Sequence, residues 1–391
     1  MFSEPVVASL LLLVLLVAGE VVSILTRARV PMLLVVLLGY LLLLWTGVFP
    51  KNIVDTSTLA TFGSLMIAPL IVHMGTLVPL KIIKAQIRAV AIALSGVIAA
   101  SLLILLIVTP IFDYGTAVAG TGPLTGGTIA YLITAGKLQN VGLETLVPVA
   151  ALILSIQGLI GMPLASFFLR RHASSVKKAL ASKTHQEIAA TAEAEAAPAP
   201  ERKGWIPERF QTQTVYLLQI FLGGTFAVLL GKWTGISYSI WALLIGLVGA
   251  LVGFYRDRML ERANSFGIAM AALIFLTMAS MNNVTVQMFV QTLPRVLVIM
   301  FVGVVGLLVG GYFASKALRW NPNKGVAVAL TALFGFPGDY LLCEEVSRSV
   351  ADNEEERKNI FDEILTPMLV GGFTTVTIAS VVIASILVKT I

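Results

Sequence analysis

Two short segments combine glycine, proline and polar side chains inside otherwise apolar stretches, and they are the strongest candidates for chemistry. The first reads Thr121-Gly-Pro-Leu-Thr-Gly-Gly-Thr128, and the second reads Gly335-Phe-Pro-Gly-Asp339. Glycine and proline interrupt a continuous helix. Each segment is therefore predicted to contain a break where backbone N–H and C=O groups are free to meet a ligand.

The first segment is suited to a small anion. A helix that begins at such a break directs free N–H groups and about half a positive charge at the ligand, which suits a carboxylate. Hydroxyl groups add hydrogen bonds, and glycines let the backbone approach closely. A competing interpretation is that the glycines only allow close helix packing. The predicted anion ligands are Thr121, Gly122, Thr125, Gly126, Gly127 and Thr128, with Gly338 of the second segment and Thr277.

The second segment is suited to a cation, because Asp339 is an ionisable residue within an apolar stretch. Freed carbonyls at Gly335 and Phe336 would join its carboxylate around Na⁺, with Ser280 and Asn282 as neutral ligands, or Asp339 would carry a proton. In the competing interpretation Asp339 only caps the second half-helix. A charged Asp339 would repel an anion, so a cation or proton is expected to neutralise it first.

The composition of the chain predicts the environment in which both segments lie. The chain has 391 residues, of which 57% are hydrophobic and only 12% charged, whereas soluble domains carry about 25% charged residues. Apolar stretches of about 20 residues match the thickness of the hydrocarbon core. The single cysteine, Cys343, cannot form an internal disulfide. These features predict an all-α polytopic membrane protein. The net charge of +6 is attributed to basic loops and not to nucleic-acid binding.

Charge distribution predicts the topology. The predicted crossing helices lie at about 5–26, 30–49, 58–80, 89–112, 143–169, 213–231, 236–255, 263–281, 296–318 and 360–388. The glycine-rich segments, at about 115–137 and 325–348, are predicted to be re-entrant hairpins or broken helices. With both termini outside, this model places 22 of the 27 Lys and Arg residues on the inner side, as the positive-inside rule requires. If all twelve segments crossed, only 16 would lie inside. The predicted location is the bacterial cytoplasmic membrane.

The chain is predicted to contain two inverted repeats of five transmembrane helices, residues 1–170 and 211–391, joined by a flexible cytoplasmic linker at 171–210, whose start is a candidate short amphipathic helix. Gly115-Thr-Ala-Val-Ala-Gly-Thr121 matches Gly325-Val-Ala-Val-Ala-Leu-Thr331, and Leu143-Glu-Thr-Leu-Val-Pro148 matches Asp362-Glu-Ile-Leu-Thr-Pro367. Inverted repeats with broken helices are typical of secondary transporters.

The same motifs, with Leu159-Ile-Gly-Met-Pro-Leu-Ala165 and Leu260-Glu-Arg-Ala263, make the chain resemble the bacterial sodium/glutamate symporters, with the 2-hydroxycarboxylate transporters as structural cousins. The resemblance covers nearly the whole chain and implies this fold and cation-coupled anion transport. The family's hairpins look like Ser-Gly-Gly-His-Gly-Thr and Gly-Phe-Gly-Leu-Gly-Ala-Thr. Here the histidine is missing, and Pro337 and Asp339 replace small residues, so glutamate is not implied as the substrate.

The expected function is therefore ion-coupled transport of a small organic anion, such as a carboxylate or an amino acid, by Na⁺ symport. H⁺-coupled transport or exchange of 2-hydroxycarboxylates is the alternative, and a channel or a membrane-embedded enzyme using His73 are the other classes. No cofactor and no catalytic activity are expected. A homodimer is expected to form through 5–49 and 213–255. Of the remaining acids, Glu20 is expected to snorkel, and Glu144 and Glu363 to be interfacial.

Overall fold

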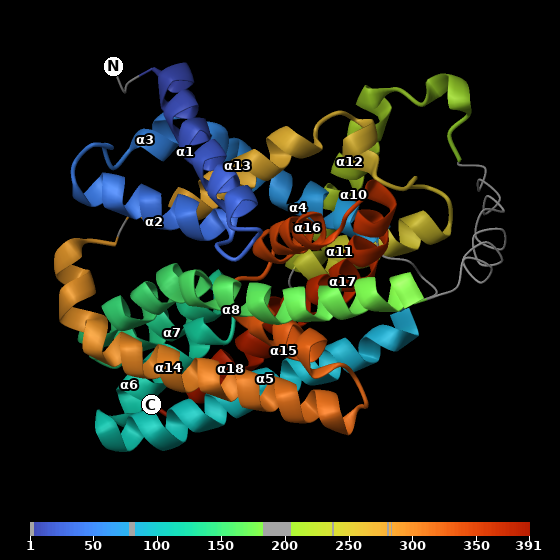
Figure 1. Cartoon of the computed structure of the whole chain (residues 1–391). Helices are drawn as coiled ribbons and strands as arrows, with labels where there is room; N and C mark the ends of the chain where they lie inside the picture. Colours follow the sequence, from blue (N-terminus) through green and yellow to red (C-terminus); the bar gives the residue numbers. More distant parts are fainter. Residues whose placement is uncertain (1–3, 78–82, 183–204, 237, 280, 283) are drawn as a thin grey trace.

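The computed structural model describes residues 4–77, 83–182, 205–236, 238–279, 281–282 and 284–391 (Figure 1). All regular structure in these ranges is helical. Seven of the described helices are long and apolar enough to cross a membrane, and three shorter helices are also apolar. The class predicted from composition, an all-α membrane protein, agrees with this architecture.

The helices fall into two sets that follow the same order along the chain. The first set is α1 (Pro5–Leu25), α2 (Met32–Trp45), α3 (Ile53–Thr56), α4 (Leu59–Leu77), α5 (Ile83–Ile111), α6 (Tyr114–Leu124), α7 (Thr128–Asn140) and α8 (Val147–Ser182). The second set is α10 (Gln213–Thr234), α11 (Tyr238–Leu251), α12 (Met259–Arg262), α13 (Phe266–Ala279), α14 (Val286–Ala317), α15 (Pro322–Leu330), α16 (Gly338–Val350) and α17 (Glu354–Phe373). The last of these continues through the π-helical turn η5 (Thr374–Ala379) into α18 (Ser380–Leu387). Helices at matching positions are of similar length except α4 and α13, with 19 and 14 residues, when α17, η5 and α18 are taken together as one helix of 34 residues against the 36 of α8.

Three of the predicted crossing helices are shorter than expected. Helices α2, α11 and α13 have 14 residues each, which extends about 21 Å and falls short of the roughly 30 Å hydrocarbon core. Left-handed residues lie next to their ends, namely Gly47 (φ 74°), Gly253 (φ 80°) and Asn264 (φ 52°). A helix cannot continue through that backbone conformation, so these apolar segments end early.

The linker also differs from its predicted bounds. The start of the linker is helical, but residues 171–182 are the last turns of α8, which runs to Ser182, and not a separate short helix. A short 3₁₀ turn follows at Glu208–Phe210. Residues 183–204 lie outside the described part of the chain.

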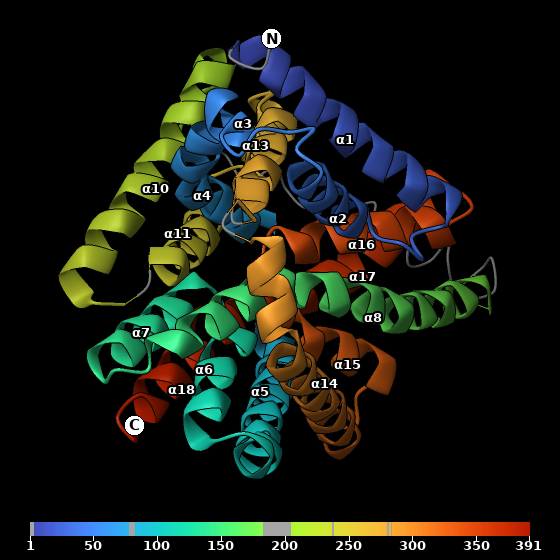
Figure 2. The same cartoon turned by 90° about the vertical axis from the view of Figure 1, so that its left-hand side faces the viewer.

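The helices form two bundles (Figures 1 and 2). The first bundle contains α1–α4 and α10–α13, and the hairpin bundle contains α5–α8 and α14–α18. The main contacts between them are α2 against α8 and α1 against α16. The first four helices of each half thus pack together, and they include the two segments, 5–49 and 213–255, that were predicted to form the dimer interface.

The hairpin bundle is built around the crossing of α5 and α14, the most extensive helix pair in the described structure. Small residues allow this approach, as is common between membrane helices. A Cβ on Gly310 would lie 2.6 Å from the carbonyl oxygen of Ser95, and one on Gly306 would overlap Ala100. The crossing therefore needs glycine on α14.

Candidate functional site

The first glycine-rich segment is a helix–break–helix that turns back on itself. Asp113 caps α6 by accepting the Thr116 N–H and hydroxyl, each at 2.7 Å. At this end of α6, the Tyr114 hydroxyl lies 2.6 Å from that of Thr390. At the break, a Cβ on Gly126 would overlap Ser380. Helix α6 has 11 residues, so the break after it lies about 15 Å from its start.

Helix α7 then runs back toward the end of the bundle at which α6 begins. Leu138, near the end of α7, clusters with Ala119 of α6 and with Leu146, and Ile391 packs against this cluster. Both ends of the segment therefore lie beside the C-terminal end of the chain.

The second segment, from α15 through the 3₁₀ turn η4 (Thr331–Leu333) to α16, has the same shape. At its start Lys324 Nζ lies 2.5 Å from Glu363 Oε1, which is 3.7 Å from His172 Nε2 on α8. At its end the Val350 carbonyl accepts a hydrogen bond from Lys177 Nζ, also on α8, at 2.9 Å. Both ends thus lie at the charged end of α8.

The break in the second segment lies deeper along α8. A Cβ on Gly161 would be 2.6 Å from Leu333, and one on Gly338 would be 2.5 Å from Met162 Cε. Met162 precedes His172 by ten residues, which is again about 15 Å along a helix. The two breaks therefore lie at similar depths, reached from different ends of the bundle.

Both breaks pack against the same side chain, Val376, in the π-helical turn η5. A Cβ on Gly127 would lie 2.7 Å from Val376 Cγ1, and one on Gly335 would lie 2.9 Å from Val376 Cγ2. Gly335 has φ +55°, a conformation that favours glycine. The sequence analysis missed this turn. The available signal was Gly371-Gly-Phe-Thr-Thr375 in the last span, where glycines and β-branched residues weaken an α-helix.

Asp339 lies beside this junction with one carboxylate oxygen free. It is fully buried, and its Oδ1 accepts the Tyr340 N–H at 2.8 Å. Its Oδ2 is buried without a hydrogen-bond partner in the described structure. A Cβ on Gly372 would lie 2.6 Å from Oδ2 and 3.5 Å from the Cα of Gly335. One oxygen thus accepts an N–H in the first turn of α16, whose N-cap residue is Pro337, while the other is buried next to Gly372 without a partner among the described residues.

The other predicted cation ligands are placed differently. The Gly335 carbonyl accepts the Asp339 N–H at 3.0 Å, and the Phe336 ring stacks on Phe373 at 6.2 Å between centroids. Asn282 accepts the hydroxyl of Tyr40 in the first bundle at 2.6 Å. Ser280 lies outside the described residues. The described residues contain no group of three or more His, Cys, Asp or Glu arranged for a metal. A cation at Asp339 would therefore rely on carbonyl oxygens.

Four of the predicted anion ligands of the first segment, Thr121, Gly122, Thr125 and Gly126, are buried within it. The Thr121 hydroxyl donates to the Ala117 carbonyl at 2.7 Å, and that of Thr125 to the Thr121 carbonyl at 2.9 Å. A Cβ on Gly122 would overlap Thr134 of α7. These contacts match the packing interpretation. The first N–H groups of α7 have no acceptor within the helix and remain as candidate donors.

Two further predicted anion ligands are not part of this buried group. The Thr128 side chain lies outside the described residues. Thr277 lies on α13 in the first bundle, where its hydroxyl donates to the Leu273 carbonyl at 2.9 Å. The structure therefore does not bring Thr277 to the breaks.

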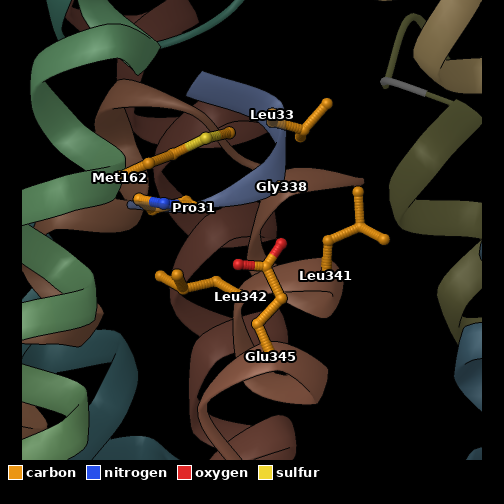
Figure 3. A pocket seen from close by; sticks show the side chains of 7 residues that line it. All are labelled: Pro31, Leu33, Met162, Gly338, Leu341, Leu342 and Glu345. Atoms are coloured by element: carbon orange, nitrogen blue, oxygen red, sulfur yellow. The ribbon is translucent and has the colours of Figure 1, made fainter. Parts of the chain in front are cut away.

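A buried glutamate that the sequence analysis missed joins the two bundles near the second break. Glu345 on α16 accepts the Ser23 hydroxyl at 2.7 Å and the Met32 N–H at 3.0 Å. Figure 3 shows its carboxylate directed into a narrow crevice that it shares with Pro31, Leu341 and Leu342, and this crevice has no room for a water molecule. Gly338 also lines this crevice, so it reaches from the break to the bundle interface. One turn along α16, Arg348 pairs with Glu20 of α1 at 3.1 Å.

His73 has a structural position in the first bundle. Its Nδ1 accepts the Leu260 N–H at 3.3 Å, at the start of α12. Its ring lies 5.3 Å from that of Phe266, and its Nε2 has no partner among the described residues.

No protein-family model matches the chain, and no curated protein matches it significantly. The arrangement of the site therefore has to be interpreted from its own chemistry.

Proposed function

We propose that the chain is an ion-coupled secondary transporter of a small organic anion that works by alternating access. The observation that carries the proposal is the meeting of two helix breaks on Val376, beside a buried carboxylate with a free oxygen. Broken helices that meet at mid-depth are the usual binding-site construction in such transporters. The motifs that resemble the sodium/glutamate symporters support the same class.

The repeated order of the helices supports an inverted repeat. Each set contains helices of about 20 and 14 residues, a four-residue turn, a helix of 14–19 residues and a long helix of about 30 residues. A broken segment and a last long helix follow in both. If each set crosses the membrane five times, the second set has the opposite orientation to the first. In this proposal, both termini are outside and the linker is in the cytoplasm of a bacterium.

The ends of the short helices support the proposed roles of substrate and ion. Helices α7 and α16 both begin at the junction, so their free N–H groups favour a carboxylate there. Asp339, in the first turn of α16, would repel that anion until a cation neutralises it. We propose Na⁺ as this cation and obligatory binding of cation before anion as the coupling. One observation favours H⁺ instead: among the described residues, Asp339 does not belong to a group of three or more His, Cys, Asp or Glu residues that could hold a metal ion.

Uptake by the full-length protein in proteoliposomes tests the proposal, with Na⁺ and pH gradients imposed separately and a panel of mono- and dicarboxylates and amino acids. Saturable uptake that requires one cation gradient is expected. Asp339→Asn is expected to abolish cation dependence, whereas Glu344→Gln on the same helix should retain it. Flux without any cation gradient would identify a passive pore. An unchanged cation response in Asp339→Asn would remove the assigned ion site.

The first bundle is proposed as the scaffold and as the interface of a homodimer. Helices α1 and α10 expose apolar side chains on its outer sides, including Val14 and Phe226. The single cysteine, Cys343, is buried, so Val14→Cys provides a clean crosslinking site. A crosslinked dimer in native-like bilayers is expected. A species of monomeric mass at saturating crosslinker would refute this interface.

A further inference from the structure

A basic pocket lies where the loop after α1 meets α8. It has a volume of about 600 Å³, and its lining includes Arg29, Arg170 and Arg171. Arg29 belongs to the first bundle, whereas the other two arginines belong to the hairpin bundle. The pocket therefore spans the boundary between the bundles at the charged end of α8.

The loop is held against α8 by two contacts. The Ser166 hydroxyl donates to the Ala28 carbonyl at 2.5 Å, and the Arg170 guanidinium donates to the carbonyl of Arg27. Ser166 is buried. Two carbonyls of a short loop are thus bound by neighbouring turns of one helix, so the pocket is formed before any ligand enters.

The positive charge of the pocket is not compensated by acidic side chains. Of the ion pairs within the described ranges, none involves Arg29, Arg170 or Arg171. Glu20 and Glu345, on the neighbouring helices α1 and α16, already have their own partners. Like charges gathered in one pocket repel one another unless an anion lies between them.

One wall of the pocket is apolar and faces outward. Phe167 is 50% exposed, Arg171 Cζ lies 4.3 Å above its ring, and Pro163 lies one turn earlier on α8. The apolar stretch of α8 ends at Leu169, directly before the arginines. The pocket therefore crosses the level at which lipid acyl chains give way to headgroups.

We propose that this pocket binds an anionic phospholipid of the leaflet on the linker side. The phosphate lies among the three guanidinium groups, and an acyl chain lies along Phe167 and Pro163. Basic pockets between transmembrane helices on the cytoplasmic side are suited to anionic headgroups, and guanidinium groups bind phosphate oxygens in pairs. A soluble anion would make no use of the exposed aromatic wall. The bound lipid joins the two bundles, and this assignment does not depend on what the protein transports.

The test measures thermal unfolding of the purified full-length protein in a neutral detergent. Three probes are titrated: dioctanoyl phosphatidylglycerol, dioctanoyl phosphatidylcholine and inorganic phosphate. The variant is Arg29→Gln combined with Arg171→Gln, which leaves the Arg170 contact with the loop intact. Lys316→Gln is the matched control, because Lys316 also lies over an aromatic ring one turn away, that of Tyr312, at 4.8 Å.

Phosphatidylglycerol is expected to raise the unfolding temperature of the wild type and of Lys316→Gln at much lower concentration than phosphatidylcholine. The double variant should bind it about 25-fold more weakly, at about fivefold for each arginine removed. An equal response of the double variant and the wild type would overturn the proposal. Phosphate acting as well as the lipid at equal concentration would also overturn it, in favour of a soluble anion.

Discussion

Replacing Glu345 by alanine tests the contact between the bundles most directly. Its carboxylate accepts hydrogen bonds from Ser23 on α1 and from the backbone N–H of Met32, the first residue of α2. No side chain caps α2 from within its own N-terminus, where Pro31 is the N-cap residue. Glu345→Ala therefore leaves two donors at a buried site without their acceptor.

The expected loss of unfolding free energy follows from these two unpaired donors. Losing a helix cap costs about 0.5–2 kcal/mol, and an unpaired buried hydroxyl costs about 1–3 kcal/mol. Removing a buried carboxylate also removes its desolvation cost, which favours the lower half of the sum, about 2–3 kcal/mol. At about 2.1 cal/mol/K of unfolding entropy per residue, a chain of this length should lose roughly 2–4 °C in Tm.

The assay combines thermal unfolding in detergent with maleimide labelling of Cys343, which is buried two residues before Glu345. Glu345→Ala should lower Tm by this amount and speed labelling, because α16 is no longer held against α2. Glu344→Ala is the matched control, since that side chain is 38% exposed and its nearest cation, Arg357, is 3.6 Å away. Equal Tm values and labelling rates in the two variants would refute the reasoning.

Two further predictions test the hairpin bundle. Gly372→Ala places a Cβ 2.6 Å from Asp339 Oδ2 and should abolish cation-dependent thermal stabilisation, whereas Gly136→Ala, which has no atom within 4 Å of its Cβ, should preserve it. An intact cation response in Gly372→Ala would place the ion elsewhere. Lys324→Met removes the cation that lies 2.5 Å from Glu363 and should cost about 1–2 kcal/mol, measured as a fall in Tm of roughly 1–3 °C. An unchanged Tm would mean that this ion pair does not hold the start of α15.

The sequence predicted those features that depend on local chemistry. Apolar length predicted the membrane class and the approximate position of each long helix. Glycine and proline predicted the breaks at Thr125–Gly127 and Phe334–Pro337, because both residue types weaken a helix wherever they occur. Asp339 was identified because a lone acid in an apolar segment is costly in any fold.

The features that were missed depend on contacts between residues distant in sequence. Glu345 caps a helix more than 300 residues before it, and no local pattern distinguishes it from its exposed neighbour Glu344. Asn282 looked like an ion ligand by residue type, but Tyr40 binds it in the first bundle. The grouping of α4 and α13 with the outer helices also follows from packing, since their hydrophobicity resembles that of every other span.

Asp339 combines a signal that is visible in the local sequence with contacts to residues distant in the chain. A buried carboxylate normally has both oxygens satisfied, because leaving one unpaired costs more than a neutral group would. Here Oδ2 has no partner among the described residues and lies so close to Gly372 that a Cβ there would be 2.6 Å away, with the Cα of Gly335 3.5 Å from the same Cβ position. Gly335 also belongs to the break that packs on Val376. A cation or proton that neutralises Oδ2 therefore binds next to the backbone that holds the two breaks together. We therefore expect ion binding at Asp339 to fix the relative position of the breaks, and the anion to bind only after that position is fixed.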